Sequence, residues 1–337
     1  MPAPFAPEAG QEHNGTDVAH PLTSQELLVQ ASRVRIGTRG SPLALAQAHE
    51  VRERLEAAHG RGRLSFEICP IKTSGDRIQD RPLADAGGKG LFTKEIEEAL
   101  LAGEIDVAVH SMKDMPTELP PGLAITCYLP REDVRDAFLS AKAPCLAALP
   151  AGAVVATSSL RRQAQVRRLR PDLAVVPIRG NVDTRLRKLA EGVADATLLA
   201  CAGLKRAGLA DRITSPIPTE EILPAVAQGA IGVESRADDL DIAQLLAPIN
   251  DQVTALAITM ERAFLAGLDG SCRTPIAGLA ELAGGRLTFR GMILTPDGTQ
   301  CHITAREGRP EEAIRLAEDA AAELLRRAGP EFFRVLS

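Results

Sequence analysis

Short apolar runs that alternate with helical patterns are the feature that most constrains how this chain can fold. From Arg33 onward, runs such as 34–38 and 154–157 read as strands, and each leads into a segment with helical spacing of apolar residues. Ser41-Pro42 follows the first run and predicts an N-cap with proline at the first helical position. Strands that alternate with helices of this length are typical of α/β layers with largely parallel sheets. The expected strands are 34–38, 64–68, 105–109, 154–157, 173–178 and 194–200.

An internal echo links two of these strand–helix units. In each unit a threonine and a basic residue start a helix, a glycine ends it, and an aspartate precedes the next strand. The two sets are Thr93-Lys94 with Gly103 and Asp106, and Thr184-Arg185 with Gly192 and Asp195. Two related α/β domains facing one another would explain the echo, and so would coincidence between two ordinary strand–helix units.

The pattern changes after Asn250. Residues 251–268 form a long helical pattern, and residues 279–306 read as hairpin-like strands with a Pro296-Asp297-Gly298 turn. A final helix is expected over 311–327. Its apolar face would comprise Ile314, Leu316, Ala317, Ala321 and Leu324. These elements predict a third, α+β domain.

The composition excludes several classes of protein. The 39 basic and 44 acidic residues of the 337 give a net charge of −5, so nothing draws the whole chain toward nucleic acid or an anionic membrane. Only 3% of residues are aromatic, which leaves few rings on which single-stranded nucleic acid could stack. No apolar run approaches the roughly 18 residues of a membrane-spanning helix. We therefore expect neither nucleic acid nor a membrane as a partner.

The cysteines and the N-terminus bear on the compartment. The six cysteines include no CxxC pair, which disfavours a metal site and a disulfide framework and fits reduced thiols in a cytoplasm. Residues 1–32 contain four acidic residues and no Lys or Arg, so they match neither a secretory signal nor a transit peptide. We expect a cytoplasmic protein with a flexible N-terminal tail, which includes a short helix near residues 25–30.

Basic residues gather where strands run into helices. Between Thr157 and Lys188 there are nine Lys or Arg and two acidic residues. A Ser/Thr-rich strand end that opens a helix presents free N–H groups and the positive end of the helix dipole. Three such corners carry arginine: 38–41, 157–162 and 179–185. They predict recognition of several carboxylates or phosphates, which arginine can bind through two hydrogen bonds.

The arginines divide into two groups. Those at the corners are expected to bind the ligand, because α/β proteins place ligands at the ends of strands. They are Arg39, Arg161, Arg162, Arg179 and Arg185. Arg167, Arg168 and Arg170 lie further along the helix, and for them we expect a solvated basic face.

Two further positions could carry chemistry. Asp114 lies in a loop after a strand and next to Lys113, where its carboxylate could point into a cleft, whereas His110 reads as a core histidine. Cys272 lies in an open loop beside Arg273, a setting that favours the thiolate, although an isolated loop cysteine is often inert. Four other cysteines lie among apolar neighbours and are expected to be packing residues, and Cys301 lies on an expected strand. The four are Cys69, Cys127, Cys145 and Cys201.

Six stretches in chain order resemble the porphobilinogen deaminase (hydroxymethylbilane synthase) family over nearly all of residues 33–337. They are Gly37-Thr38-Arg39-Gly40-Ser41-Pro42-Leu43-Ala44, Gly87-Gly88-Lys89-Gly90-Leu91-Phe92, His110-Ser111-Met112-Lys113-Asp114, Thr157-Ser158-Ser159-Leu160-Arg161-Arg162, Arg179-Gly180-Asn181-Val182, and Glu261-Arg262 through Gly270-Ser271-Cys272-Arg273-Thr274-Pro275. Together, over some 240 residues, they are very specific for that family.

The resemblance implies a fold and an activity. The fold would be α/β, with two periplasmic-binding-protein-like α/β domains and a smaller C-terminal α+β domain, in a monomer. The implied boundaries are 33–132 plus about 229–248 for the first domain, 133–228 for the second and 249–337 for the third, with residues 1–32 as an N-terminal extension. Such enzymes join four porphobilinogen molecules head to tail into linear hydroxymethylbilane, release four ammonia, and need no metal.

The resemblance also implies roles for individual residues. A dipyrromethane cofactor would be attached through a thioether to Cys272, and Asp114 would be the general acid and base. Contacts to the cofactor would come from Ser111, Lys113, Thr157, Ser158, Ser159, Arg161 and Arg162. Contacts to the substrate would come from Arg39, Ser41, Arg179, Gly180 and Arg185, and Lys89 would lie on a mobile loop over the cleft.

The chain departs from the family pattern in two places, and two other classes of protein are alternatives to this family. Relatives often have a second basic residue four positions before the loop lysine, where this chain has Asp85, and the acidic extension has no counterpart in the family core. A non-enzymatic anion receptor of periplasmic type would also suit the arginine corners, but the missing signal and the Cys272 loop disfavour it. A nucleic-acid binder that uses 160–170 is disfavoured by the net charge and the scarcity of aromatic residues.

Overall fold

The computed structural model describes residues 33–77, 90–268 and 275–334. Three positions expected to matter, Asp85, Lys89 and Cys272, lie outside these ranges, as does the helix expected near residues 25–30.

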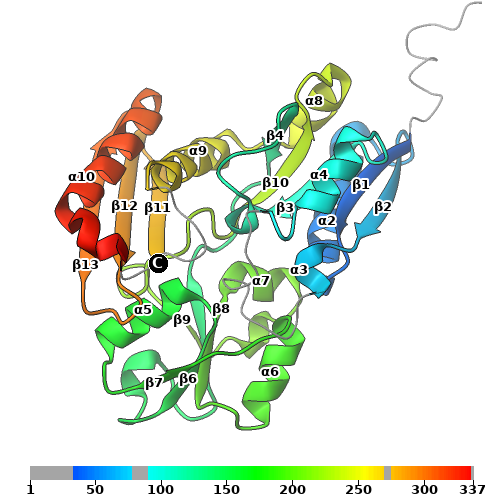
Figure 1. The fold of residues 1–337 in the computed structure, drawn as a ribbon. Coiled ribbons are helices and arrows are strands. Elements are labelled where there is room, and N and C mark those ends of the chain that lie inside the picture. The colour runs from blue at the N-terminus through cyan, green and yellow to red at the C-terminus, as the bar shows by residue number, and fades with distance from the viewer. Residues whose placement is uncertain (1–32, 78–89, 269–274, 335–337) are drawn as a thin grey trace, which may run out of the picture. The chain divides into compact units, whose positions relative to one another are not determined.

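The first sheet has five strands in the order β2-β1-β3-β10-β4 (Figure 1). Their bounds are β1 Arg33–Arg39, β2 Ser65–Ile71, β3 Val107–Ser111, β4 Leu123–Tyr128 and β10 Ile231–Arg236. Helix α2 (Pro42–His59) covers one face, where its Val51 and Leu55 share a core with Val107 and Val109 of β3. Helix α4 (Lys94–Leu101) covers the other face and shares a core with Ala108. Alternate residues of β3 therefore point to opposite layers, as an α/β sheet requires.

The second sheet repeats this order as β7-β6-β8-β5-β9. Its strands are β5 Asp136–Leu139, β6 Val154–Ala156, β7 Ala174–Val176, β8 Ala196–Ala200 and β9 Ser215–Pro216. Helix α5 (Leu160–Leu169) contributes Val166 to the core on one face. Helices α6 (Val182–Ala190) and α7 (Cys201–Arg206) contribute Leu186 and Leu204 to the other.

Both sheets are largely parallel, as expected from the sequence, but each contains one reversed strand, so that four of its five strands run in one direction. In the first sheet β1 is parallel to β2 and β3, but β10 is antiparallel to both of its neighbours. In the second sheet β5 holds the corresponding antiparallel position. The reason is the chain path: β5 and β10 are entered after the chain crosses between the sheets, through residues 129–135 (the outgoing crossing) and 217–230 (the return crossing), not after a covering helix.

The C-terminal part consists of a meander and two helices. Strands β11 (Ile276–Ala283), β12 (Arg286–Leu294) and β13 (Cys301–Gly308) pair antiparallel in that order. Helices α9 (Gln252–Gly267) and α10 (Ala313–Arg334) supply the apolar residues that cover the sheet, with the rings of Phe264 and Phe289 edge to face at 4.8 Å. The predicted α+β character is confirmed. The assignment of Ile314 to the apolar face of the last helix is wrong, because that side chain is exposed and Ala313 and Ala320 are buried instead.

Shorter elements complete the description. They are the helices α3 (Ser74–Arg77) and α8 (Leu240–Leu246) and the 3₁₀ turns η1 (Met112–Asp114), η2 (Leu146–Ala148), η3 (Ala210–Arg212), η4 (Ala247–Ile249) and η5 (Pro310–Glu312). None of the helices in the described ranges combines the length and apolar character needed to cross a membrane. Cys145 is exposed, contrary to the expected packing role, because its neighbour Leu146 takes the buried place at the start of η2.

Candidate active site

The three predicted arginine corners form where β1, β6 and β7 run into helices α2, α5 and α6 (Figure 1). A polar side chain caps each helix. Ser41 Oγ accepts a hydrogen bond from the N–H of Ala44 at 3.3 Å, Ser159 Oγ from that of Arg162 at 3.4 Å, and Asn181 Oδ1 from that of Thr184 at 2.9 Å. These caps fix the backbone at each corner. The remaining N–H groups of each first helical turn are the donors that an anion could use.

Strand β3 brings a fourth segment, η1, to the site. It runs two residues further than the sequence suggested, so His110 and Ser111 belong to the strand itself. Met112 and Met115 are buried, whereas Lys113 and Asp114 between them are exposed. The two methionines anchor the turn and leave the two charged side chains to project from it. The carboxylate of Asp114 has no hydrogen-bond or ion-pair partner in the described part of the chain.

Lys113 lies in an unusual electrostatic position. Its side chain is accessible to water, yet protein atoms surround it densely, and this desolvation lowers its pKa. Asp114 opposes the shift, and Arg162 and Arg161 add to it. Lys113 therefore lies within electrostatic range of the arginines at the start of α5, a helix of the other sheet.

Those arginines form a buried triad with Asp136. Arg161 Nη2 lies 2.8 Å from Asp136 Oδ2, and Arg162 Nη2 lies 2.7 Å from Oδ1. Arg161 also donates to the carbonyl of Leu223 and Arg162 to that of Leu198. Burial alone would raise the pKa of Asp136, but the two guanidinium groups outweigh it and hold that pKa far below its usual range.

The triad keeps an excess of positive charge. Two guanidinium groups face one carboxylate, and the Nε atoms of both arginines are buried without a hydrogen-bond partner among the described residues. Buried donors without partners are uncommon in native proteins. An anionic group such as a carboxylate would satisfy them, so these residues fit a cofactor that carries carboxylates.

The hydroxyl groups beside the triad form hydrogen bonds within the protein. Ser158 Oγ donates to the carbonyl of Ile178 at 2.7 Å, and Thr157 Oγ1 accepts from the N–H of Ser159 at 3.3 Å. Ser111 Oγ lies 2.7 Å from the amide nitrogen of Gln47 on α2. Each of these side chains is thus held in a defined orientation. Ser158 and Ser111 both donate and accept, with Ile178 and Gln47 respectively, and each keeps one further lone pair, whereas the hydroxyl proton of Thr157 is not used in these contacts.

The third corner adds two more arginines. Arg185 Nε donates to the carbonyl of Gly180 at 2.8 Å, and the pKa of Arg185 falls to about 10 because of burial and the nearby charges of Arg162 and Arg179, against the opposing charge of Asp114. Gly180 has φ +117°, and a Cβ there would lie 2.4 Å from the Thr184 side chain. Only glycine allows this turn to be so tight. Arg179 has no side-chain partner in the described ranges.

At the first corner, Arg39 lies over an aromatic ring. Its guanidinium carbon is 4.0 Å from the centre of the Phe92 ring. This cation–π contact holds the guanidinium at the end of β1. Arg39 thus lies on the same sheet as Asp114, whereas Arg179 and Arg185 lie on the other.

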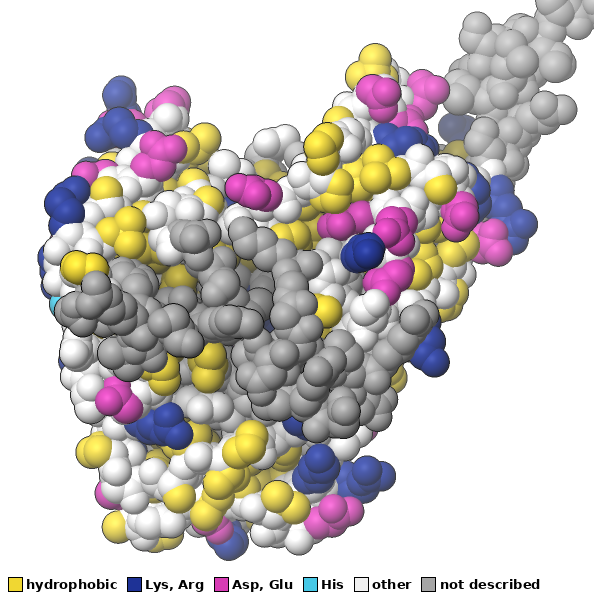
Figure 2. Space-filling model, viewed as in Figure 1, with side chains coloured by type: hydrophobic (Ala, Val, Ile, Leu, Met, Phe, Trp, Pro, Cys, Tyr) yellow, Lys and Arg dark blue, Asp and Glu magenta, His cyan; other side chains and the backbone are white. Residues whose placement is uncertain are grey.

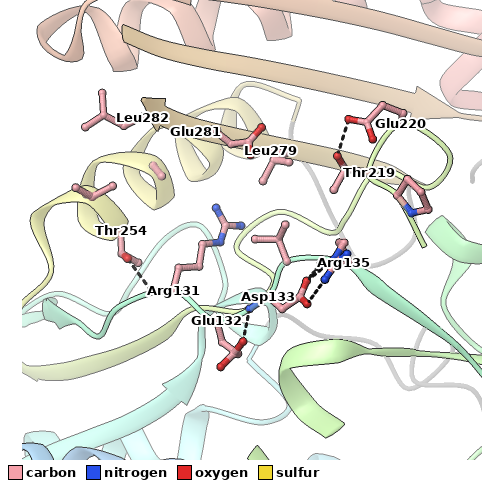
Figure 3. Close-up of a pocket in the computed structure, with 15 residues that line it drawn as sticks. Arg131, Glu132, Asp133, Arg135, Thr219, Glu220, Thr254, Leu279, Glu281 and Leu282 are labelled. Carbon is pink, nitrogen blue, oxygen red and sulfur yellow. Dashed lines mark hydrogen bonds and ion pairs between the residues drawn. The ribbon is translucent and has the colours of Figure 1, made fainter. Parts of the chain in front are cut away.

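A hollow of about 610 Å³ lies elsewhere, between the outgoing crossing, α9 and β11 (Figure 3). Its charged groups pair with one another or with neighbours, as in Asp133 with Arg135. A much smaller hollow is lined by Ser111 and Lys113 together with Arg206, which donates from Nε to Glu50 and from Nη1 to the carbonyl of Gly229. We place the candidate site beside the smaller hollow, because its Lys113 lies within electrostatic range of Asp114, Arg161 and Arg162.

The structure thus brings most of the predicted residues into one electrostatic group. Asp114, Lys113, Arg161, Arg162, Arg179 and Arg185 influence one another, whereas Cys272 and Lys89 lie outside the described residues. Sequence reasoning missed Asp136, Phe92 and Arg206. The pattern Arg135-Asp136 in an apolar strand was a usable signal, since a carboxylate buried in a strand needs a cation.

The solvated basic face expected along α5 is only partly present. Arg168 is exposed, but Arg167 donates to the carbonyl of Pro296, and Arg170 donates to the carbonyls of Leu146 and Leu149. Figure 2 shows charged side chains of both signs scattered over the face it displays, outside the grey residues. Arg167, Arg168 and Arg170 therefore do not form one solvated basic face.

Comparison with known proteins yields matches over most of the chain. The family model described as "Porphobilinogen deaminase, dipyromethane cofactor binding domain" matches residues 34–244, and "Porphobilinogen deaminase, C-terminal domain" matches residues 255–326. The porphobilinogen deaminase of Paracoccus denitrificans (strain Pd 1222) is 61% identical over 300 residues, which are 89% of this chain and 96% of the relative. That of Nitrobacter hamburgensis is 61% identical over 302 residues, with 90% and 96% covered.

Solved structures give more distant matches. The periplasmic VFT2 domain of Bordetella pertussis BvgS is 17% identical with a TM-score of 0.38, over 67% of this chain and 89% of that one. YhfZ from Shigella flexneri is 16% identical with a TM-score of 0.35, over 71% and 98%.

Proposed function

The chain belongs to the porphobilinogen deaminase family, and we propose how its residues divide the work of that family's reaction, with Asp114 as the general acid and base. The enzyme condenses four porphobilinogen molecules head to tail into linear hydroxymethylbilane and releases four ammonia, a step of tetrapyrrole biosynthesis. Its cofactor is dipyrromethane. The cofactor supplies the pyrrole carbon to which the first substrate unit is joined.

The exposed and unpartnered carboxylate of Asp114 carries the proposal. Loss of ammonia from porphobilinogen requires a proton for the leaving amine and leaves a cationic azafulvene. A carboxylic acid can give that proton, and the carboxylate that remains can stabilise the cation. Asp114 suits both steps because none of the described residues binds its oxygens, while the cationic side chains of Lys113 and Arg185 lie within electrostatic range of it.

We assign the residues around the triad to the cofactor. Arg161 and Arg162 would bind carboxylates of the cofactor through the donors that Asp136 leaves unused. Lys113 would add a further positive charge. The hydroxyl groups of Ser111, Thr157, Ser158 and Ser159 would add hydrogen bonds, and the thiol of Cys272 would form the thioether.

We assign the other corners to the substrate. Each porphobilinogen carries an acetate and a propionate, so the growing chain needs a series of cations. Arg39, Arg179 and Arg185 would supply them, with the backbone at Ser41 and Gly180 as additional donors and Lys89 on the loop above.

Replacement of Asp114 tests the chemical role. Asp114→Asn keeps the shape and the hydrogen-bonding capacity but loses the charge and the proton. We expect turnover per cofactor-loaded molecule to fall by ~10²–10⁴-fold, because general acid–base catalysis contributes about that much. Both kcat and kcat/KM should fall, since the carboxylate acts mainly in the transition state.

The controls separate chemistry from folding and loading. Asp114→Glu keeps the carboxylate and should retain partial activity, and thermal unfolding of the Asn variant should match the parent, since Asp114 is exposed. Holoprotein content is measured by mass alongside the rate. A loaded Asn variant within about tenfold of the parent would show that Asp114 is not the general acid and base.

The attachment site is tested by intact-protein mass. Active protein should exceed the mass of the chain by two linked pyrrole units, and peptide mapping should place the excess on Cys272. Cys272→Ser should lose both the excess mass and the colour with acidified Ehrlich reagent, whereas Cys145→Ser, at an exposed thiol outside the site, should keep both. Active protein of unmodified mass would contradict the assignment.

We further propose three domains, a monomer and a cytoplasmic location. The domains would be 33–132 plus about 229–248, 133–228 and 249–337, and the presence of one sheet in each range supports this division. The monomer and the location rest on the family resemblance and on the cysteine usage. Light scattering of the purified chain and fractionation of cells would test them.

A further inference from the structure

Helix α9 carries the consecutive pair Glu261-Arg262, to which the reaction described above assigns no role. The two side chains contact different parts of the protein. Glu261 is fully buried and accepts four hydrogen bonds, two from Arg131 and one each from the N–H groups of Ala227 and Ala280. Every lone-pair direction of this carboxylate has a donor, so its position is tightly determined.

Glu261 holds together the elements on either side of the segment that contains Cys272. Helix α9 ends at Gly267 and β11 begins at Ile276, so both flank that segment in sequence. The 2.8 Å hydrogen bond from the N–H of Ala280 to Glu261 Oε1 joins β11 to α9. Glu261 therefore ties the helix before the segment to the strand after it.

Arg262 contacts the segment that follows Asp114. Its Nη2 donates to the carbonyls of Pro116 at 2.7 Å and Thr117 at 3.1 Å. Among the described residues Arg262 forms no ion pair, and burial lowers its pKa, against the opposing influence of Tyr128 and Glu234. A desolvated guanidinium that donates hydrogen bonds to two backbone carbonyls fixes the position of those carbonyls.

The apolar contacts reinforce this arrangement. Met112 and Met115, which flank Lys113 and Asp114, belong to the same buried cluster as Met260 and Phe264 of α9. The turn that bears Asp114 thus packs on α9 through Met112 and Met115, and Arg262 holds the residues that follow the turn.

We propose that Arg262 is a positioning residue that holds the turn bearing Asp114 in place against α9. The inference rests on the proposed role of Asp114. Glu261 fixes α9 to β11 and to both crossings, and Arg262 fixes the segment that follows Asp114 to α9, so adjacent residues of one helix tie the acid to the C-terminal part of the protein. A misplacement of about 1 Å at such a site can reduce a rate by roughly 10²-fold.

The test compares Arg262→Met, Arg262→Lys and the parent as loaded enzymes. Methionine keeps an unbranched apolar stem but donates no hydrogen bond. We expect kcat per loaded molecule to fall roughly 10- to 100-fold, with KM within about twofold of the parent and the mass of the covalent cofactor unchanged. Lysine can still donate to a carbonyl and should recover part of kcat. Arg315→Met, which removes an exposed arginine of α10 that pairs with Glu312, is the matched control and should behave as the parent.

The outcomes are distinguishable. A loaded Arg262→Met enzyme with kcat within about twofold of the parent overturns the proposal, as does a loss of activity that only follows the loss of folded or loaded protein. If the methionine variant does not fold, Arg262→Leu, which likewise donates no hydrogen bond, gives the same comparison. Absence of pyrrole mass on Cys272 in the parent would instead contradict the proposed attachment site. The kcat of the Arg262 variants relative to the parent would still decide whether Arg262 is a positioning residue.

Discussion

Asp114 and Asp136 share a group of cations but differ in burial. Asp136 is fully buried between Arg161 and Arg162, whereas Asp114 is exposed, and both influence the pKa of Lys113. A carboxylate fixed by two guanidinium groups has no freedom to take up a proton near neutral pH. An exposed one without such partners can exchange protons with a ligand. Burial therefore assigns Asp136 to holding the two arginines, and the exposure of Asp114 supports the chemical role that we propose for it.

Two arginine substitutions should affect different stages of the reaction. Arg162→Leu removes a donor of the buried triad, so we expect a lower fraction of cofactor-loaded protein by mass. Arg179→Leu removes an unpaired, half-buried cation and should mainly raise KM for porphobilinogen. Leaving a carboxylate unpaired in a partly dry site costs ~2–5 kcal/mol, or roughly 30-fold or more in binding.

The comparison needs both measurements on each variant. Arg187→Leu, at an exposed arginine of α6 that pairs only with Glu191, is the control. Normal cofactor loading in Arg162→Leu together with an unchanged KM in Arg179→Leu would show that these two arginines bind neither the cofactor nor the substrate.

Residue types could be predicted from the sequence better than their partners. The Arg161-Arg162 pair was recognisable at a helix start, because N-cap chemistry and charge are local in sequence. Asp136 could be suspected of needing a cation, but its pairing with these arginines could not be predicted, because it lies 25 residues before Arg161 and reaches the arginines only when β5 joins the second sheet. Phe92 was missed as a support for Arg39 for the same reason: the contact joins a segment before α4 to the end of β1.

At the scale of elements, the internal echo corresponds to equivalent positions in the two sheets. Asp106 donates its N–H to the carbonyl of Arg35 and accepts from the N–H of the same residue. Asp195 makes the same pair of hydrogen bonds with Val154. Each aspartate lies just before a central strand, β3 or β8, and fixes it to its parallel neighbour. A short sequence similarity thus reflects one structural device used twice.

The junction between β13 and α10 gives a pH-dependent prediction. Glu323 accepts hydrogen bonds from Thr304, Arg306 and Arg327, which hold its pKa at about 2, below its usual 4.5. Because the folded-state pKa is depressed, the stabilisation is complete above about pH 4.5 and is lost as the pH falls toward 2.

Glu323→Gln should therefore lower the free energy of unfolding by only ~1 kcal/mol at pH 7, since water partly screens the group. Urea unfolding at pH 7 and pH 4 checks this, with a smaller difference from the parent expected at pH 4. Glu311→Gln, at a residue of η5 outside this network, is the control. A difference between Glu323→Gln and the parent that grows on acidification would contradict the assignment.

Element types could be predicted from sequence because periodicity and caps are local. Helix α2 begins after Ser41 and α5 ends before Pro171, as the residues indicate. The reversed direction of β5 and β10 could not be predicted, because it depends on which sheet the chain enters after a crossing. The apolar run of β10 carries no sign that it inserts between β3 and β4.

At the scale of the molecule, Glu261 connects segments far apart in the chain. Its partners lie on the outgoing crossing, the return crossing and β11. Glu261→Gln removes the negative charge that compensates Arg131. It also places an amide N–H₂ group, itself a donor, against N–H donors, so hydrogen bonds at one end of the side chain are lost. Breaking a buried ion pair typically costs ~3–5 kcal/mol, so we expect a fall in Tm of roughly 10 °C.

Calorimetry of the loaded enzyme measures this change. Glu318→Gln, at an exposed position of α10, should leave Tm unchanged. A shift of less than about 2 °C in Glu261→Gln would mean that the crossings are held by other contacts.

The insertion of β10 between β3 and β4 has a consequence for synthesis on the ribosome. Strand β4 borders only β10 in its sheet, and all of β5 to β9 is translated before β10 appears. At ~5–20 residues per second, β3 and β4 wait on the order of ten seconds with open edges. The second sheet, whose strands follow one another without interruption, can close during that interval. The nascent chain thus completes its later sheet first, and its earlier strands are the ones that need protection from wrong pairing.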